Sequence, residues 1–220
     1  MLTGKLELLL SNSQFGFRKN RSTTDAILTF QHFVLSGFRA CEDAGRATNV
    51  IAVFFDIAKA FDSVPFDKII SCLQNKFHLS SSWLHFLDSY LTGRSMRIRV
   101  GQVLSEASRI VSGVPQGSIL GPTLFTAFIN QVVETEIHSK SGIIMYADDI
   151  AYIHAIDSED SESIIQEDIN LLSDRISSIG LKLNARKCQY MVIGLGNQRS
   201  RSQVWLSVGN NDLEMVLVYK

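Results

Sequence analysis

The spacing of apolar residues divides the chain into segments with a helical period and short segments with the composition of strands. Helices are predicted for residues 23–39, 66–77, 83–91, 118–136 and 161–179. Strands are predicted for residues 49–55, 94–100, 142–147, 150–155, 204–208 and 213–218, the last two joined as a hairpin. This order of strands and packing helices predicts an α+β architecture, in which a β-sheet is layered on helices.

Two adjacent carboxylates, Asp148 and Asp149, separate the predicted strands 142–147 and 150–155, so we expect them at the tip of a hairpin. Like charges repel there and have no obvious packing role, and a divalent cation would offset that cost. A third acid, Asp56, ends a continuous apolar run, as a buried central strand does when it reaches a site. If that strand lies beside the hairpin, three carboxylates converge.

Carboxylate oxygens suit Mg²⁺ or Mn²⁺, and magnesium prefers a few carboxylates completed by water and substrate phosphates. Two such ions about 3.5 to 4 Å apart activate an attacking hydroxyl and stabilise the leaving oxygen of an in-line phosphoryl transfer. The three acids therefore point to polymerase chemistry.

Five collinear segments then resemble the motifs of reverse transcriptases. FFDIAKAFDSV (54–64), SGVPQGSILGPTLF (112–125) and YADDIAYI (146–153) resemble the three palm motifs in the right order. SQFGFRKNRSTTDAI (13–27) resembles the fingers motif of the non-LTR retrotransposon and group II intron branch, and GLKLNARKCQYMVI (180–193) resembles the lysine-bearing segment after the catalytic hairpin. Within that branch, the long stretch between the first two palm motifs favours a LINE-type enzyme over an intron enzyme.

The resemblance implies a right-hand polymerase fold, with fingers at about 1–49 and 63–112 and an antiparallel palm sheet packed on helices at about 50–62 and 113–220. A thumb follows the palm in this family, and the sequence ends before one. We therefore expect the thumb to be missing, either because the reading frame is truncated or because the chain is a fragment.

The same resemblance assigns the catalytic residues. Asp56 and Asp148 would be the metal ligands, Ile57 would offer its backbone carbonyl, and Asp149 would be the supporting acid. Lys187 corresponds to the lysine that protonates the leaving pyrophosphate. The alternative for Lys187 is a solvated lysine on a polar connector.

Further residues match the family's nucleotide and primer contacts. Phe61 corresponds to the residue that lies beneath the incoming sugar and excludes a 2′-hydroxyl, against the alternative of a core phenylalanine. Gln116 would lie beside the sugar, and Gly117 would allow close approach of the backbone, although the segment is also a turn before a helix. Tyr146 would pack near the primer end, or simply pack before a tight turn.

Basic residues are concentrated in the first half of the chain. Residues 1–109 hold 13 Lys/Arg against 9 Asp/Glu, whereas residues 130–174 hold 11 acids and one base, within a formal net charge of −1. Arg18 and Arg21 resemble fingers residues that reach the triphosphate. Arg94, Arg97 and Arg99 suit a template backbone, and ordinary solvated faces are the alternative for all of these arginines.

The resulting hypothesis is an RNA-directed DNA polymerase that extends a DNA primer on an RNA template, using deoxynucleoside triphosphates and two Mg²⁺ or Mn²⁺ ions. Two alternatives stay open: an inactive retroelement remnant that folds or binds RNA, and an RNA-dependent RNA polymerase or related palm enzyme. Phe61 and the Tyr-Ala-Asp-Asp turn argue against an RNA-dependent RNA polymerase.

Other features narrow the class of protein. The three cysteines, Cys41, Cys72 and Cys188, show no zinc-ligand spacing and are expected to be reduced thiols of an intracellular protein, in the nucleus and/or cytoplasm if it acts as retroelements do. No apolar run approaches the roughly 20 residues that span a membrane, so we expect no membrane partner. The sequence carries no indication of the oligomeric state.

Overall fold

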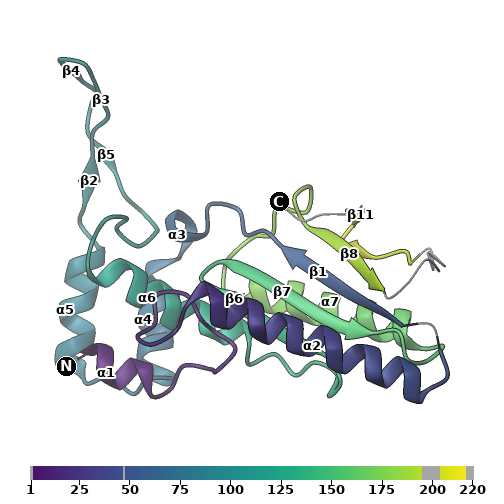
Figure 1. Cartoon of the computed structure of the whole chain (residues 1–220). Helices are drawn as coiled ribbons and strands as arrows, with labels where there is room; N and C mark the ends of the chain where they lie inside the picture. The colour runs from purple at the N-terminus through teal and green to yellow at the C-terminus, as the bar shows by residue number, and fades with distance from the viewer. Residues whose placement is uncertain (1, 47, 195–203, 217–220) are drawn as a thin grey trace. The chain divides into compact units, whose positions relative to one another are not determined.

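The computed structural model describes residues 2–46, 48–194 and 204–216, which divide between two compact units (Figure 1). The sheet unit comprises Ser11–Ala58 and Ile129–Lys220. The helical unit comprises Met1–Leu10 and Lys59–Phe128. The predicted α+β class is confirmed, whereas the predicted boundaries of fingers and palm stay a prediction.

A five-stranded sheet forms the centre of the sheet unit, in the order β11-β8-β1-β7-β6. Its strands are β1 (Asn49–Phe55), β6 (Gly142–Tyr146), β7 (Asp149–Ala155), β8 (Gln189–Gly194) and β11 (Glu214–Met215). Neighbouring strands are antiparallel except β11 and β8, which are parallel. Strand β1 is central and nearly all of it is buried, which is why its sequence is a continuous apolar run without alternation.

Two long helices pack on this sheet, α2 (Thr23–Asp43) and α7 (Ser161–Ser178). Helix α2 begins at a capping box in which Ser22 and Asp25 bond each other's backbone N–H groups. It approaches β1 so closely that a Cβ at Gly37 would lie 2.7 Å from a methyl carbon of Val50. Helix α7 lies behind the sheet in Figure 1 and contacts a short 3₁₀ helix, η1 (Asn130–Val132).

The helical unit contains α1 (Leu2–Glu7), α3 (Ala60–Ser63), α4 (Phe66–Asn75), α5 (Ser81–Leu91) and most of α6 (Leu120–Ile129). Helices α4 and α5 pack against each other. Fully buried side chains from these helices form the core of the unit: Leu6, Ile69, Leu73, Leu87, Leu91, Leu124 and Phe125. In the described part of the chain, no helix is both long enough and apolar enough to cross a membrane.

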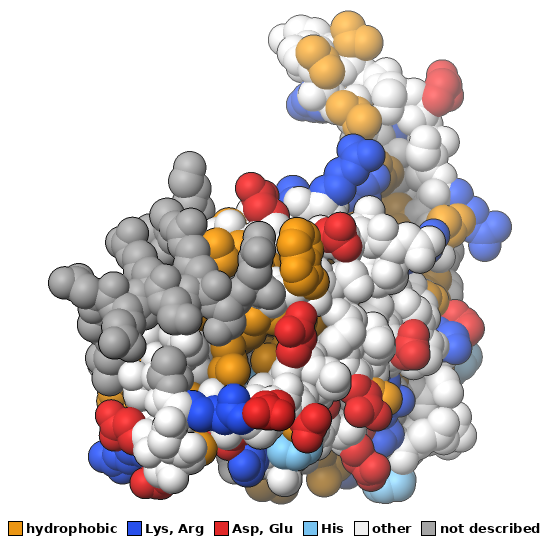
Figure 2. Space-filling view, turned by 90° about the vertical axis from the view of Figure 1, so that its right-hand side faces the viewer, with side chains coloured by type: hydrophobic (Ala, Val, Ile, Leu, Met, Phe, Trp, Pro, Cys, Tyr) orange, Lys and Arg blue, Asp and Glu red, His pale blue; other side chains and the backbone are white. Residues whose placement is uncertain are grey.

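A two-stranded arm replaces the single strand predicted for residues 94–100. It consists of β2 (Ser95–Met96), β3 (Arg99–Val100), β4 (Val103–Leu104) and β5 (Ser108–Arg109), with β2 paired to β5 and β3 to β4. The ladder is interrupted where the Ser105 hydroxyl, and not a backbone carbonyl, accepts the N–H of Ile98. Figure 2 shows hydrophobic and basic side chains along this arm, at the top of the view.

Two other predicted elements were too long. The helix predicted for 118–136 is α6 followed by η1, because the chain tightens at Asn130, whose buried side chain accepts the N–H of Ser11. The predicted C-terminal hairpin is only β9 (Ser207–Val208) and β10 (Asn211–Asp212). Glu214 and Met215 leave it to pair with β8, and residues 217–218 lie outside the described residues.

Candidate functional site

The predicted acid-tipped hairpin is formed by β6 and β7. Tyr146 pairs with Asp149 as the last rung of the ladder, so Ala147 and Asp148 make a two-residue turn. Ala147 is buried and has a φ of +59°, a conformation that residues other than glycine rarely adopt. Asp148 is half-buried and Asp149 is exposed. The turn therefore presents both carboxylates at the end of the sheet.

The third acid follows β1, and β1 does lie beside the hairpin, paired with β7. Phe55 lies opposite Ile150 in this antiparallel ladder. Asp56 follows Phe55 and Asp149 precedes Ile150, so one further step of this ladder would set the two acids opposite each other, where side chains project on the same side of the sheet. The register of β1 therefore brings Asp56 to the same end of the sheet as the acidic turn.

The electrostatics of the acids agree with this register. Partial desolvation, together with the negative charges of Asp148 and Asp56, raises the pKa of the Asp149 carboxyl. A charge acts on a neighbour in this way only when the two groups are close. The three carboxylates thus form one electrostatic group, as expected if β1 lies beside the hairpin.

The backbone around Asp56 is held by the segment before β8. Asn184 donates its N–H to the carbonyl of Asp56, and the N–H of Asp56 donates to the sulfur of Cys188 at 3.4 Å. Ile57 forms an isolated antiparallel bridge with Leu183. Desolvation raises the pKa of the Cys188 thiol, so this residue is a neutral, buried packing group. The end of β1 is therefore fixed from the side opposite β7.

Lys187 lies at the site. Its Nζ is 3.9 Å from Oδ1 of Asp56, and its side chain is 69% exposed. So exposed an ion pair contributes little to stability, and the lysine remains available to other anions. The structure therefore brings Lys187 to Asp56, and its expected role stays a prediction.

The donor set fits a hard divalent cation, because three carboxylates that repel one another lie at one partly exposed place. As the side chains lie in the structure, however, no group of three or more His, Cys, Asp or Glu among the described residues is arranged so that it could hold a metal ion by itself. Magnesium completes its shell with water and substrate phosphates, so a few carboxylates are a sufficient protein contribution.

The arginines of the predicted fingers motif bond to protein groups. Arg18 donates to the backbone carbonyls of Ser11 and Gln14. Arg21 donates to the side chain of Asn12 at 2.7 Å. Their expected contact with a triphosphate stays a prediction, and the structure adds a local role, since both guanidinium groups order the segment that precedes α2.

The remaining predicted residues belong to the helical unit. The ring of Phe61 stacks on Phe125, with centroids 4.0 Å apart. The Gln116 side chain donates to Oδ1 of Asp62 at 2.8 Å, and Gly117, with a φ of +76°, makes the turn before α6. Gln116 also lines an open hollow of about 750 Å³, together with Lys59, Asp62, Arg94 and Met96. The sugar contacts implied for Phe61 and Gln116 stay predictions.

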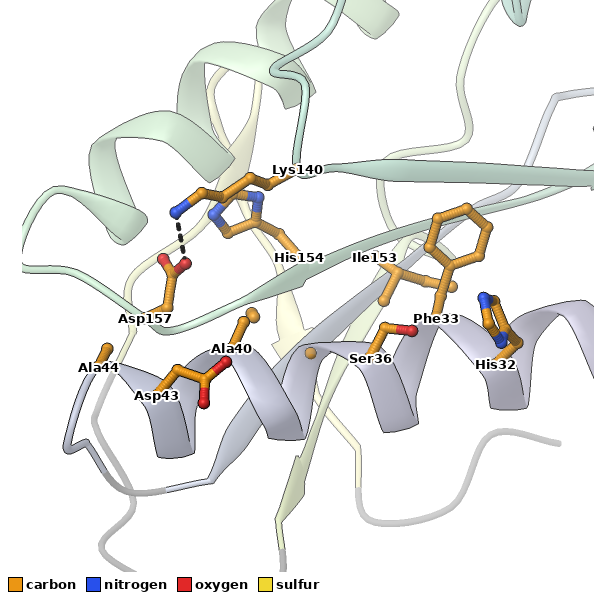
Figure 3. A pocket seen from close by; sticks show the side chains of 12 residues that line it. His32, Phe33, Ser36, Ala40, Asp43, Ala44, Lys140, Ile153, His154 and Asp157 are labelled. Carbon is orange, nitrogen blue, oxygen red and sulfur yellow. Dashed lines mark hydrogen bonds and ion pairs between the residues drawn. The ribbon is translucent and has the colours of Figure 1, made fainter.

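A second hollow, of about 680 Å³, lies between α2 and the far end of β7 (Figure 3). Lys140 and Asp157 cross its rim as an ion pair of 2.7 Å. Although desolvation opposes it, the hydrogen bond and charge of Lys140 hold the pKa of Asp157 below its usual value. None of the predicted site residues lines this hollow.

Three residues near the acids were not predicted as site residues from the sequence. Asn184 and Cys188 lie within the segment that carries Lys187, so their proximity to Asp56 follows from that assignment. Gln14 is fully buried, and its side chain bonds the backbone of Ala147. In the sequence, Gln14 was indicated only by its position two residues before Gly16 of the fingers motif.

Comparisons with known proteins agree with this geometry. The family model described as "Reverse transcriptase (RNA-dependent DNA polymerase)" matches residues 2–209. The chain is 31% identical over 185 residues to the probable RNA-directed DNA polymerase from transposon BS of Drosophila melanogaster, covering 81% of this chain and 20% of that protein. It is 30% identical over 181 residues to the RNA-directed DNA polymerase from mobile element jockey of Drosophila funebris, covering 80% and 19%.

These relatives come from non-LTR retrotransposons, the branch predicted from the motifs. The chain spans about a fifth of their length. Among solved structures, apo telomerase from Candida tropicalis truncated from the C-terminal domain is similar, with a TM-score of 0.64 and 16% identity over 89% of this chain and 40% of that one. This likeness confirms the fingers-palm fold alone. With a family model that covers most of its length, the chain belongs to the reverse transcriptase family.

Proposed function

We propose that this chain transfers deoxynucleotides to the 3′-hydroxyl of a DNA primer under the direction of an RNA template. The observation that carries the proposal is the group of three carboxylates at the end of the sheet, where Asp56 follows the strand that pairs with β7, beside the Asp148 turn. Family membership supports the same reaction, because the curated relatives are named RNA-directed DNA polymerases.

In this proposal Asp56, Asp148 and the carbonyl of Ile57 hold two divalent ions, with Asp149 as the supporting acid. Bound Mg²⁺ or Mn²⁺ would activate the primer hydroxyl and stabilise the leaving oxygen. The rigid ladder of β1 and β7 keeps the acids in place, so that little reorganisation is needed when the ions and nucleotide arrive. Lys187, at 3.9 Å from Asp56, supplies a proton to the departing pyrophosphate.

The other residues carry selectivity. Phe61, held by its stack on Phe125, excludes a 2′-hydroxyl by its bulk, and Gln116 and Gly117 border the sugar. Tyr146, 36% exposed at the end of β6, contacts the primer end. Arg18 and Arg21 reach the triphosphate only if they exchange some of their present partners for phosphate oxygens.

Primer extension on an RNA template with Mg²⁺ and labelled deoxynucleotides tests the proposal. The chain should extend the primer, and the double variant Asp148→Ala, Asp149→Ala should lose extension. Asp174→Ala, which removes an exposed carboxylate from α7, is the matched control and should retain it. No extension by the folded chain would refute the activity for residues 1–220 and support the inactive remnant.

The choice of nucleotide distinguishes the proposed DNA polymerase from the remaining alternative, an RNA-dependent RNA polymerase. A DNA polymerase should use deoxynucleotides in preference to ribonucleotides, and Phe61→Ala should weaken that preference. Preferential use of ribonucleotides by the unmodified chain would favour an RNA-dependent RNA polymerase. In a cell, the proposed reaction places the protein in the nucleus and/or cytoplasm, where an RNA template is present.

A further inference from the structure

The turn that carries Asp148 contains a residue in an unfavourable conformation. Ala147 has a φ of +59°, where its Cβ crowds the following carbonyl. Its exposed fraction is 5%, so its backbone N–H and C=O are shielded from water and need protein partners. Such a conformation persists only where surrounding groups hold it. The position of the adjacent Asp148 therefore depends on what holds Ala147.

One side chain holds both backbone groups of Ala147. The Oε1 atom of Gln14 accepts the N–H of Ala147 at 3.1 Å, and its Nε2 donates to the carbonyl of Ala147 at 3.3 Å. Oε1 also accepts the N–H of Gly16 at 2.8 Å. Gln14 has no exposed surface, so water does not compete for these bonds. The Gln14 amide thus bonds both backbone groups of Ala147, as the backbone of a neighbouring strand would.

Gln14 is itself held in register with β6. The N–H of Phe15 donates to the carbonyl of Met145 at 2.8 Å, and the N–H of Met145 donates to the carbonyl of Ser13 at 2.8 Å. Arg18 donates to the carbonyl of Gln14 at 2.9 Å. Gln14 therefore forms an isolated parallel bridge with Met145 of β6, and this bridge carries its amide to the turn.

Gly16 makes the contact possible. A Cβ at this position would lie 2.3 Å from the backbone nitrogen of Ala147, closer than real Cβ atoms approach. Any larger residue would push segment 13–18 and the acidic turn apart. Position 16 therefore requires glycine, because it lies too close to the turn for a Cβ atom.

We propose that Gln14 is a positioning residue of the acidic turn: it holds Ala147 in its left-handed conformation and thereby aims the Asp148 carboxylate at the metal ions. This inference rests on the proposed function for the role of Asp148. Gln14 has no exposed surface, so in this proposal it acts through the backbone of Ala147. Its loss should therefore affect metal affinity and turnover, and leave the affinity for nucleotide and template largely unchanged.

The test compares Gln14→Met and Gly16→Ala with the unmodified chain. Methionine keeps the length of the side chain and removes both the donor and the acceptor. Asn130→Ala is the matched control, because Asn130 is also a buried amide that bonds the same N-terminal segment, at Ser11, without touching the turn. Thermal melting and circular dichroism identify any variant that fails to fold.

Three measurements decide the outcome. Hydrogen exchange at Ala147 should become about tenfold faster in Gln14→Met, because a buried hydrogen bond is lost. Mn²⁺ binding, followed by electron paramagnetic resonance, should weaken by about 10- to 100-fold, the usual effect of removing a group that orients a metal ligand. Where the chain extends primers, kcat should fall by about 100-fold with KM for deoxynucleotide unchanged.

The proposal is overturned if Gln14→Met keeps the exchange rate of Ala147 and the Mn²⁺ affinity of the unmodified chain, or if Asn130→Ala produces the same losses. Failure of the proposed function looks different. In that case the unmodified chain neither extends primers nor binds Mn²⁺, while exchange at Ala147 still reports whether Gln14 holds the turn.

Discussion

Replacement of Asp168 by alanine should destabilise the sheet unit strongly, because this buried acid joins helix α7 to the acid-bearing hairpin. Asp168 is 2% exposed, and its Oδ1 accepts the N–H of His138 at 2.9 Å. Its Oδ2 accepts the hydroxyl protons of Ser141 at 2.6 Å and Tyr152 at 2.9 Å. Ser141 immediately precedes β6 and Tyr152 lies on β7, so the acid holds both strands.

The magnitude follows from the bonds that are lost. Hydrogen bonds to a charged group contribute about 1.5 to 3 kcal/mol each, and a buried group left without a partner costs about 1 to 3 kcal/mol. The hydroxyl of Tyr152 keeps a 3.1 Å contact with Ser141, which reduces the loss. We therefore expect a decrease of about 3 to 5 kcal/mol in the free energy of unfolding. For a chain of this size it corresponds to about 6 to 20 °C in Tm.

Urea unfolding followed by circular dichroism measures the effect. Tyr152→Phe alone should cost about 1 kcal/mol. The double variant Asp168→Ala, Tyr152→Phe should cost less than the sum of the single variants, because it contains no tyrosine hydroxyl left without its carboxylate partner. Asp174→Ala, on an exposed position of the same helix, should change the free energy by less than about 0.5 kcal/mol. A loss below about 1 kcal/mol for Asp168→Ala, or full additivity in the double variant, would show that the hydrogen bonds of Asp168 do not stabilise the sheet unit as predicted.

Three further predictions follow from charges in the structure. Asp148→Asn should lower the raised pKa of Asp149 by removing a neighbouring negative charge, as measured by carbon NMR titration, and an unchanged midpoint would contradict the electrostatic group. Burial lowers the pKa of His154, so below about pH 6.5 the unfolded chain binds the proton more readily than the folded chain. The free energy of unfolding should therefore decrease as the pH is lowered, by at most about 1.4 kcal/mol per pH unit. Urea unfolding between pH 5.5 and 7.5 should show this slope, His154→Gln should flatten it, and an equal slope in the variant would refute the assignment. Replacing Arg97 and Arg99 of the two-stranded arm by alanine should weaken RNA binding in fluorescence anisotropy and reduce the salt slope by about 2, and an unchanged slope would mean that neither arginine contacts phosphate.

Much of the sheet could be predicted, because its buried strands are runs of apolar residues that are visible in the sequence. The apolar run of β1 has no alternation since both of its faces are covered, and the runs of β6 and β7 flank the two acids. The arm was harder to predict, because exposed strands lack a buried face. The side chain of Ser105 interrupts its ladder in a way that no periodicity records.

The acids Asp56, Asp148 and Asp149 could be identified from the sequence alone, because they stand beside apolar runs that have the length and composition of strands. The partners that hold them were decided only by the tertiary structure. Gln14 meets Ala147 across 133 positions, and Asp168 meets Tyr152 from another element. A pattern of apolar and polar residues reports how deeply a segment is buried, and it holds no information on which distant side chain will satisfy a buried backbone or hydroxyl group. That choice is made when strands and helices pack, since only then do the lengths and directions of the side chains select their partners.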